Sequence, residues 1–287
     1  MRKACDSFIN CNEKKVVLFE KNEYSIMDCI KCGHRSAKIY KAENHIEQVF
    51  SDDYFFAGKQ GYPNYLHQKD ILFKYGIKYA KIISKYATPG KMLDVGSAAG
   101  FILKGFEQSG WICHGLEPNY SMASYGRNEL KLDITTGNLE SFKTTQRFNL
   151  VNMIQVIGHF VDLDKALQNV SHLLNKNGLV LIESWDMKSI IARIMGKHWH
   201  EYCPPSVINW FSDETLTQLL NYYGFRLITQ GRPSKKINIK HGLSVFDENT
   251  SRFIFKKQII KFLSRTIGKF NINYPLFDLK WYLFKKL

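Results

Sequence analysis

The stretch "MLDVGSAAGF", residues 92–101, decides the fold of this sequence. The run Met92–Val95 is apolar except for Asp94, which is the pattern of a strand buried in a parallel sheet. A glycine, three small residues and a second glycine follow, and then a new apolar run begins. Gly96 can adopt backbone angles closed to other residues, and Gly100 lets a helix start close to the strand. The stretch predicts a strand, a tight turn and a helix, and the turn either only packs or holds a cofactor.

The same alternation of strand and helix continues along the chain. Apolar, strand-like runs are predicted at residues 91–95, 111–118, 133–137, 148–159, 179–185 and 225–231. Helical patterns are predicted at residues 69–86, 99–110, 121–130, 162–178 and 213–224. Strands that alternate with helices in this way form βαβ units. The sequence therefore predicts an α/β fold with a mostly parallel sheet and helices on both faces, in which ligands bind beyond the carboxyl ends of the strands.

The chemistry of the glycine-containing turn limits which cofactor it can hold. A dinucleotide site has G-x-G-x-x-G, whereas this turn is G-S-A-A-G, and no P-loop motif occurs, so a phosphate is not expected here. The free N–H groups at the start of the helix suit a carboxylate. Glu117 ends the next strand, 23 residues after Asp94, where an acid accepts hydrogen bonds from both hydroxyls of a ribose. A carboxylate, a ribose and no phosphate are features of S-adenosylmethionine.

Five segments follow one another in the order and at the spacing of a known family. They are "LDVGSAAGF", "GLEPN", "TGNLE", "FNLVNMIQVIGHF" and "LLNKNGLVLIES". With these segments the chain resembles the class I S-adenosylmethionine-dependent methyltransferases over roughly residues 50–287, and in particular a bacterial subgroup with an N-terminal cysteine cluster. The resemblance implies a Rossmann-like sheet of seven strands. The last strand would be antiparallel and is expected within residues 274–284.

The resemblance also implies which residues hold S-adenosylmethionine. They fall into groups for the methionine portion (Asp94, Gly96, Ser97 and Gly100), the ribose (Glu117 and the adjacent Pro118), the adenine (Asn138 and Leu139) and the methyl end (Gln155). Tyr54 and Tyr62 either close over the cofactor or pack beneath the N-terminal segment.

The acceptor end needs a nucleophile held in line with the methyl group, and a base if that nucleophile is a hydroxyl. His159 is the first candidate for the base, and the alternative is a histidine that caps a helix or packs. The family often has Glu-His where this chain has Gly158-His159, which disfavours metal-assisted O-methylation. Relatives also have a lid histidine where this chain has Val207. His200 and Tyr202 are the candidates to replace it.

A cysteine cluster lies near the N-terminus. The segment "CIKCG" has the spacing of a zinc knuckle, in which both thiolates point at one ion. The cluster predicts a structural Zn²⁺ site, or its metal-free remnant, formed by Cys5, Cys11, Cys29 and Cys32. We expect a zinc-ribbon-like element at residues 1–45 and a methyltransferase domain at residues 46–287. The domain would contain a lid at residues 186–212 and a basic helical insertion at residues 240–272.

The charge of the chain is concentrated at one end. The net charge is +14, and residues 232–287 hold 13 Lys and Arg against three acids. A basic amphipathic helix is predicted at residues 252–270, and it either touches an anionic membrane or lipid-linked substrate or docks on the sheet. Neither a signal-peptide pattern nor an apolar run of about 18 residues occurs, so a cytoplasmic protein is expected.

The expected function is methyl transfer to a small-molecule acceptor, on a hydroxyl of a sugar, a glycan precursor or a secondary metabolite. One alternative is an RNA methyltransferase that uses the cysteine cluster and the basic surface, although no Asn/Asp-Pro-Pro-Tyr element follows the fourth strand. The other alternative is a catalytically inactive module that only binds the cofactor, which Gly158 and Val207 motivate.

Overall fold

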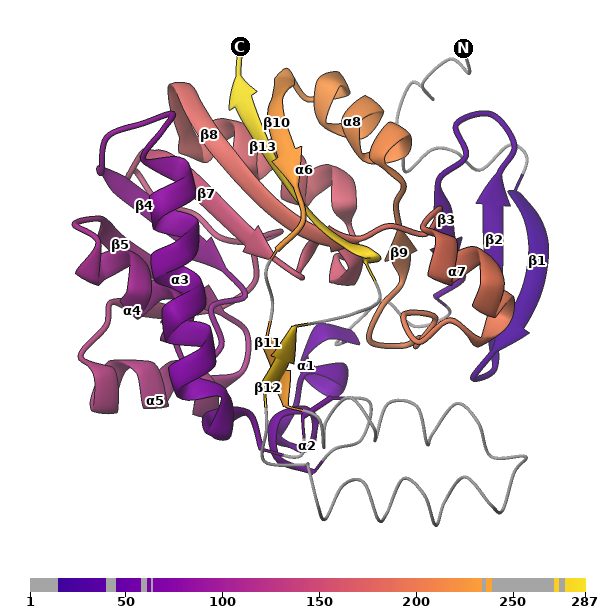
Figure 1. Ribbon diagram of the computed structural model, residues 1–287, viewed down its shortest axis with the longest axis horizontal. Coiled ribbons are helices and arrows are strands. Elements are labelled where there is room, and N and C mark those ends of the chain that lie inside the picture. Colours follow the sequence, from indigo (N-terminus) through magenta and orange to yellow (C-terminus); the bar gives the residue numbers. More distant parts are fainter. Residues whose placement is uncertain are drawn as a thin grey trace.

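Figure 1 shows the protein as a computed structural model, with the chain running from the N-terminal strands to the C-terminal strand of the main sheet. The structure describes residues 15–39, 45–57, 61–62, 64–233, 236–238, 271–273 and 277–287.

The centre of the molecule is a seven-stranded sheet in the order β10-β13-β8-β7-β4-β5-β6. Its strands are β4 (Lys91–Val95), β5 (Ile112–Glu117), β6 (Ile134–Thr136), β7 (Phe148–Ile154), β8 (Leu174–Trp185), β10 (Phe225–Gly231) and β13 (Leu279–Lys286). Every neighbouring pair is parallel except the two pairs that contain β13, which are antiparallel. The predicted Rossmann-like fold is confirmed, including the antiparallel strand near the end of the chain.

Helices cover both faces of this sheet because its central strands are apolar on both sides. Successive residues in a strand point to opposite faces. Met92 packs with α3 (Lys69–Ile83), α4 (Phe101–Gln108) and α5 (Tyr120–Leu130), whereas the next residue, Leu93, packs with α6 (Leu163–Leu173) and α8 (Asp213–Tyr222). Strands β7 and β8 alternate in the same way. The sheet is therefore buried between two helical layers, and ligands can reach it only at the ends of its strands.

Helix α6 ends earlier than the sequence predicts. The predicted helix spans residues 162–178, but α6 ends at Leu173 and the chain enters β8 at Leu174, which pairs with Phe148 of β7. Lys286 of β13 explains this end, because its Nζ donates to the carbonyl oxygens of Ser171 (2.6 Å) and Leu174 (3.0 Å). A cation at the last carbonyls of a helix stabilises its C-terminus.

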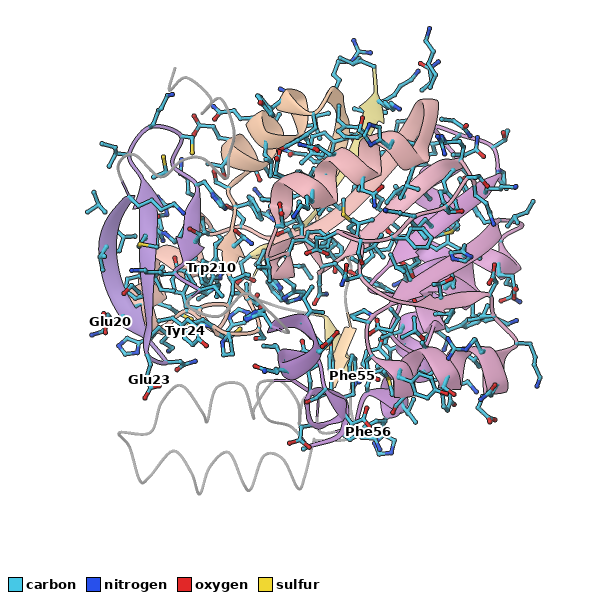
Figure 2. All side chains as sticks on the ribbon, turned by 180° about the vertical axis from the view of Figure 1, so that it is seen from behind. Glu20, Glu23, Tyr24, Phe55, Phe56 and Trp210 are labelled. Carbon is cyan, nitrogen blue, oxygen red and sulfur yellow. The ribbon has the colours of Figure 1, made fainter. Side chains whose placement is uncertain are left out.

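A second sheet lies at one end of the molecule and has the order β1-β2-β3-β9. Strands β1 (Lys15–Lys21), β2 (Tyr24–Cys29) and β3 (Arg35–Ala37) come from the predicted N-terminal element, and β9 (Asn209–Trp210) comes from the predicted lid. Figure 2 shows Trp210 beside this sheet, with Glu23 and Tyr24 at the end of the first hairpin. Residues on the two sides of the predicted boundary at residue 45 thus share one sheet.

Several short elements surround the carboxyl end of the main sheet. Helices α1 (His45–Val49), α2 (Asp52–Phe56) and η2 (Tyr65–Gln68) precede α3; η3 (Ile157–His159) follows β7; and α7 (Ile190–Met195) and η4 (Gly196–His198) belong to the lid. Strands β11 (Lys236–Asn238) and β12 (Asn271–Asn273) pair antiparallel, so the last residues of the predicted insertion 240–272 are a strand. The predicted helix 252–270 lies outside the described residues. In the described part of the chain, no helix is long and apolar enough to span a membrane.

Candidate cofactor and acceptor site

The turn between β4 and α4 has the geometry that its glycines predict. Gly96 has φ +67° and Gly100 has φ +82°, both in the left-handed region that favours glycine. The Gly96 N–H donates to the Leu116 carbonyl at 2.8 Å, which ties the turn to the end of β5. A β-carbon on Gly96 would lie 2.7 Å from Cγ2 of Val156. The glycine therefore allows the turn to approach the loop that follows β7.

Glu117 ends β5 and is buried beneath this turn. Its Oε2 accepts the Ala98 N–H at 2.8 Å, and its Oε1 accepts the Asn119 N–H at 2.8 Å. Burial raises the pKa of Glu117 to about 7, although these two backbone N–H groups oppose the shift. Each carboxylate oxygen has a second lone pair, so the side chain can still accept the two hydroxyls of a ribose. The bond to Ala98 fixes the turn that the sequence predicts.

Asp94 is buried at the end of β4 beside Asn152, its cross-strand neighbour on β7. Asn152 Nδ2 donates to Asp94 Oδ1 at 2.7 Å, while Asn152 Oδ1 has no partner among the described residues. Burial raises the pKa of Asp94 to about 7, and the negative charge of Glu117 adds to the shift. Neither carboxylate forms an ion pair with a described residue, so both are available to a cationic ligand.

Ser97 provides a direct test of whether the turn suits a ligand. Its Oγ is buried and has no hydrogen-bond partner among the described residues, which is rare in folded proteins. The Oγ packs against Gly115, on which a β-carbon would lie 2.8 Å from it. The unsatisfied hydroxyl, two carboxylates that form no ion pair with described residues and a turn without a phosphate-binding motif fit the amino-acid end of S-adenosylmethionine. The residues present therefore fit the cofactor that the resemblance implies.

The loop after β6 carries the two residues predicted to flank the adenine. Strand β6 pairs with β5 so that Thr136 is opposite Glu117, and the Gly137 N–H donates to the Glu117 carbonyl at 3.0 Å. Asn138 Oδ1 accepts the N–H and the hydroxyl of Ser141, at 3.0 and 2.7 Å. Leu139 is buried. The structure thus brings this loop next to Glu117. Pro118 follows Glu117 at the same edge.

Gln155 follows β7 in a left-handed conformation with φ +58°. Such a backbone costs roughly 1–2 kcal/mol in a residue with a β-carbon. Two bonds to one residue hold it: the Gln155 N–H donates to the Glu183 carbonyl at 2.9 Å, and Nε2 donates to Glu183 Oε1 at 2.7 Å. Glu183, on β8, is a buried carboxylate that the sequence analysis did not identify.

A row of aromatic rings connects the turn with the acceptor side. Tyr65 stacks on Phe101 of α4 with ring centroids 5.8 Å apart, and Tyr62 contacts Tyr65 at 5.0 Å. Tyr54 lies 6.1 Å from Tyr62 and 5.1 Å from Phe50. Burial raises the pKa of Tyr62 to about 12, and the charges of carboxylates on the lid and on β8 contribute. Both predicted tyrosines pack in the cluster that contains Ala98 and Ala99 of the turn.

His159 lies at the other end of this aromatic row. Its ring contacts Phe50 at 5.0 Å, and its Nδ1 lies 2.6 Å from the Ser206 carbonyl oxygen, so Nδ1 carries the proton. Burial lowers the pKa of His159 below its usual value, although the carbonyls of Ser206 and Gln155 oppose the shift. The ring is therefore neutral near pH 7 and held in one orientation.

Gly158 and Val207, the two positions that the resemblance marks as differing from the family, pack against each other. A β-carbon on Gly158 would lie 3.2 Å from Cγ1 of Val207 and 3.0 Å from the Asn209 carbonyl oxygen. The Ile208 N–H donates to the Gly158 carbonyl at 2.9 Å. The lid thus lies directly on residue 158. A larger side chain at residue 158 would displace the lid. The glycine at 158 and the valine at 207 are therefore two sides of one contact.

The other two catalytic candidates lie deeper in the lid. His200 packs between the rings of Trp185 (5.0 Å) and Trp199 (5.9 Å), with its Nε2 3.6 Å from Glu201 Oε1. Tyr202 is buried among aromatic rings, and its hydroxyl accepts a hydrogen bond from Arg35 of β3. The structure does not bring this hydroxyl together with His159. It places Tyr202 in the contact between the lid and the N-terminal sheet.

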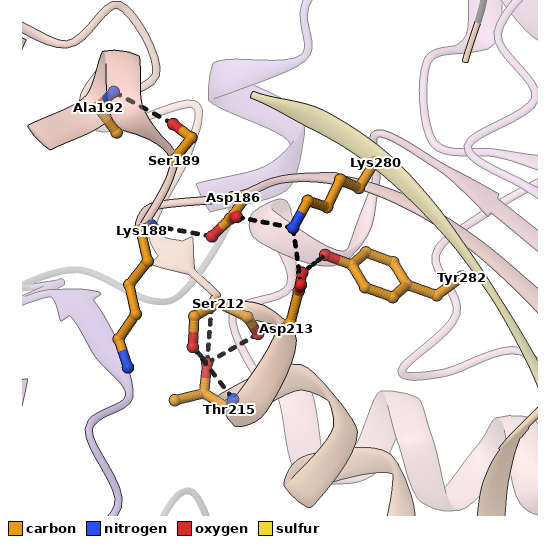
Figure 3. A network of polar contacts seen from close by, with 9 residues as sticks. All are labelled: Asp186, Lys188, Ser189, Ala192, Ser212, Asp213, Thr215, Lys280 and Tyr282. Atoms are coloured by element: carbon orange, nitrogen blue, oxygen red, sulfur yellow. Dashed lines mark hydrogen bonds and ion pairs between the residues drawn. The ribbon is translucent and has the colours of Figure 1, made fainter. Parts of the chain in front are cut away.

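Both ends of the lid are attached to one lysine of β13 (Figure 3). Lys280 Nζ lies 3.0 Å from Asp186, the first lid residue, and 2.6 Å from Asp213, which follows the lid. Tyr282 donates to Asp213 at 2.6 Å. The segment between these two aspartates is therefore a loop with closely fixed ends.

The cysteine knuckle is present, but a metal site is not shown. Cys29 and Cys32 are buried at a turn in which Gly33 has φ +76°, and the Gly33 N–H donates to the Cys29 carbonyl at 2.8 Å. Within the described ranges no group of three or more candidate ligands could hold a metal ion. Cys5 and Cys11 lie outside those ranges, so the zinc site stays a prediction.

Sequence reasoning missed several polar residues of this region. Glu183 and Glu201 are the missed carboxylates; Glu183 lies within the segment "LLNKNGLVLIES", but no role was assigned to it. Asn119 is a third case: its Nδ2 donates to the Phe50 carbonyl and to Asp52 Oδ1, both at 3.0 Å. It thereby attaches the segment that contains Phe50 and Asp52, which precedes α3, to the end of β5. The sequence shows Asn119 within "GLEPN", which was the only available signal.

Together the parallel sheet, the glycine turn at its carboxyl edge and the acid at the end of the next strand define a class I S-adenosylmethionine-dependent methyltransferase. The chain belongs to the family described as "Methyltransferase domain", whose pattern matches residues 74–230, more than half of the sequence.

Known relatives and structures agree with this family. The chain is 26% identical over 116 residues to a ubiquinone biosynthesis O-methyltransferase from Pelagibacter ubique, a match that covers 38% of this chain and 48% of the relative. The chain thus spans about half the length of the curated relatives it matches.

Solved structures share the fold at low sequence identity. An S-adenosylmethionine-dependent methyltransferase from Thermotoga maritima has a TM-score of 0.54 at 15% identity, over 86% of this chain and all of the other. Magnesium protoporphyrin IX methyltransferase from Synechocystis, with S-adenosylhomocysteine bound, has a TM-score of 0.55 at 12% identity, over 84% of this chain and 100% of the other. These likenesses show the fold alone.

Proposed function

We propose that this protein transfers the methyl group of S-adenosylmethionine to a hydroxyl of a small-molecule acceptor. One observation supports the proposal above all: a continuous row of aromatic rings joins the cofactor turn at Phe101 to the ring of His159. A base candidate and a cofactor turn thus border one region at the carboxyl edge of the sheet, where ligands of such folds bind.

The cofactor would be held by the residues around the turn. Asp94 and the Ser97 hydroxyl would bind the amino-acid end, Glu117 the ribose, and Asn138 with Leu139 would flank the adenine. Gln155 would lie at the methyl end. Tyr54 and Tyr62, from the segment before α3, would cover the site. When bound, the cofactor supplies a methyl group on a positively charged sulfur, which needs no further activation.

His159 would act as the general base for the acceptor. Its Nδ1 donates to the Ser206 carbonyl, so Nε2 carries the lone pair that would accept the proton of a hydroxyl. Burial lowers the pKa of His159, which keeps the ring unprotonated at neutral pH. Orientation of the acceptor against the methyl group would supply the larger part of the rate increase, about 7–11 kcal/mol at most.

The proposed acceptor class is supported by the relatives and by one difference in sequence. The curated relatives are named O-methyltransferases, which favours a hydroxyl as the methylated group. Gly158 stands where relatives often carry an acid, so deprotonation would rely on His159 rather than on a metal held by that acid. We propose a hydroxyl of a sugar, a glycan precursor or a secondary metabolite as the acceptor.

The test is mass spectrometry of the purified protein incubated with S-adenosylmethionine that carries a deuterated methyl group and extracts of its own cell. A metabolite that gains the labelled methyl group on oxygen supports the proposal, and His159→Asn should abolish the gain while it retains cofactor binding. Label on nitrogen or carbon, or label in RNA, would refute the acceptor assignment. Failure of the wild-type protein to bind the cofactor in calorimetry would refute the site.

A further inference from the structure

Glu183 is an anionic side chain buried behind the predicted methyl end of the site. Its side chain is 0% exposed, and its partners are three neutral donors. Tyr75 donates to Oε2 at 2.6 Å, Tyr79 donates to the same oxygen, and Gln155 donates to Oε1 at 2.7 Å. No described lysine, arginine or histidine pairs with it. The described hydrogen-bond partners of this side chain are thus all neutral.

The carboxylate determines which way the Gln155 amide points. Only the NH₂ group of the amide can face an anion, because the reverse orientation would bring two acceptor oxygens together. With Nε2 on Glu183, the carbonyl Oε1 points away from Glu183, and no described residue donates to it. The backbone N–H of Gln155, which also bonds Glu183, prevents the residue from moving. A free carbonyl oxygen is therefore held at the carboxyl end of β7.

The negative charge of Glu183 extends into the site. The two tyrosines that bond it come from one face of α3, four residues apart, and remain neutral. Beyond them, the charge of Glu183 acts on Tyr62, which is proposed to cover the cofactor. Burial raises the pKa of Tyr62 to about 12, and Glu201 and Glu183 add to the shift. An unpaired charge in a site of low dielectric acts over several ångströms.

We propose that Glu183 is a positioning residue that, through Gln155, makes the methyl end of the site electronegative and selects the charged cofactor over its neutral product. The sulfonium of S-adenosylmethionine is a cation, whereas the thioether of S-adenosylhomocysteine carries no charge on sulfur. A fixed carbonyl dipole with an anion behind it stabilises only the first. The site would thus release the product once the methyl group has left. This inference rests on the proposed function.

Calorimetry with S-adenosylmethionine and S-adenosylhomocysteine on the same protein tests the proposal. Glu183→Gln keeps the shape but removes the charge, and it allows the Gln155 amide to reverse. We expect it to weaken binding of S-adenosylmethionine about tenfold and to leave S-adenosylhomocysteine almost unchanged. Gln155→Met should lower the same ratio, and Glu183→Gln should lower it less in that background than in the wild-type protein, since Glu183 acts in part through Gln155. Tyr75→Phe is the matched control: it removes one donor but keeps the charge, so the ratio should not change.

The outcomes separate this inference from the proposed function. Equal loss of both ligands in Glu183→Gln would mean that Glu183 only supports the fold, and this would overturn the inference while the cofactor site stands. Wild-type protein that binds neither ligand would overturn the proposed function itself. Should Glu183→Gln not fold, as judged by circular dichroism, Gln155→Met decides: an unchanged ratio in that variant overturns the inference.

Discussion

Replacing Asp94 by asparagine should make the ligand-free protein more stable at alkaline pH. Asp94 is buried without an ion pair, and burial raises its pKa to about 7. An unfolded aspartate ionises near 3.8, so folding must bring a charge into the interior at any pH above this value. Asparagine has the same shape and no charge. It can still accept from Asn152 Nδ2 through its amide oxygen.

The size of the effect follows from the shift in pKa. One pKa unit corresponds to about 1.4 kcal/mol, so a change from 3.8 to about 7 costs the folded wild-type protein at most about 4 kcal/mol above pH 7. Because the pKa of Asp94 is raised in the folded protein, Asp94 does not lower the free energy of unfolding below pH 3.8. Its destabilising effect grows as the pH rises from 3.8 to about 7. Asp94→Asn should therefore gain about 2–4 kcal/mol at roughly pH 8 and almost nothing at roughly pH 4.

Denaturant unfolding of the two proteins across this pH range measures the difference directly. Glu117 titrates in the same range, but it is present in both proteins and its contribution largely cancels. Calorimetry should at the same time show weaker binding of S-adenosylmethionine by the variant, since the cationic amino group loses its carboxylate. A variant that is no more stable than wild type at pH 8, or a gain that does not shrink toward pH 4, would show that Asp94 is not a buried charge.

Three further predictions concern the turn, the base and the lid. Gly96→Ala should weaken cofactor binding at least about tenfold in calorimetry. Residue 96 has φ +67°, and the added methyl group would lie 2.7 Å from Val156. Full affinity of the variant would contradict this. His159→Asn should lower kcat about 10²–10⁴-fold with unchanged cofactor affinity. In the wild-type protein, the rate should fall only below pH 6.5 on the acidic side, because burial lowers the pKa of His159. Lys280→Met should cost roughly 1–3 kcal/mol of stability and speed proteolysis within the lid. The exposed Lys188→Met is its control, and equal effects of the two would show that the lid is held elsewhere.

The main sheet was predictable because buried parallel strands leave a local signature. Strand β4 is a mostly apolar run that ends in a glycine turn, and this pattern depends only on neighbouring residues. The acid of β5 was predictable for the same reason, since its position relative to the strand end is local. The structure places Asp94 and Glu117 together at one edge, as the parallel arrangement requires.

The residues that sequence reasoning missed act over long distances in the chain. Tyr75 and Glu183 are 108 residues apart, and nothing near either residue indicates the bond between them. The early end of α6 depends on Lys286, which is 115 residues from the carbonyl it binds at Ser171. A helical pattern over 162–178 cannot reveal such a partner. Contacts of this kind arise only when the sheet brings distant segments together.

The position of β13 has a consequence for how the protein is synthesised. β13 separates β8 from β10 in the sheet, although the ribosome produces it after both. Until Leu279–Lys286 has emerged, the apolar edge of β8 has no neighbour on that side, and open edges pair readily with other chains. Nascent chains are therefore most exposed to aggregation between synthesis of Trp185 and Lys286. Rapid translation of this interval, or a holding chaperone, should raise the yield of folded protein, because either shortens or shields the exposure of β8.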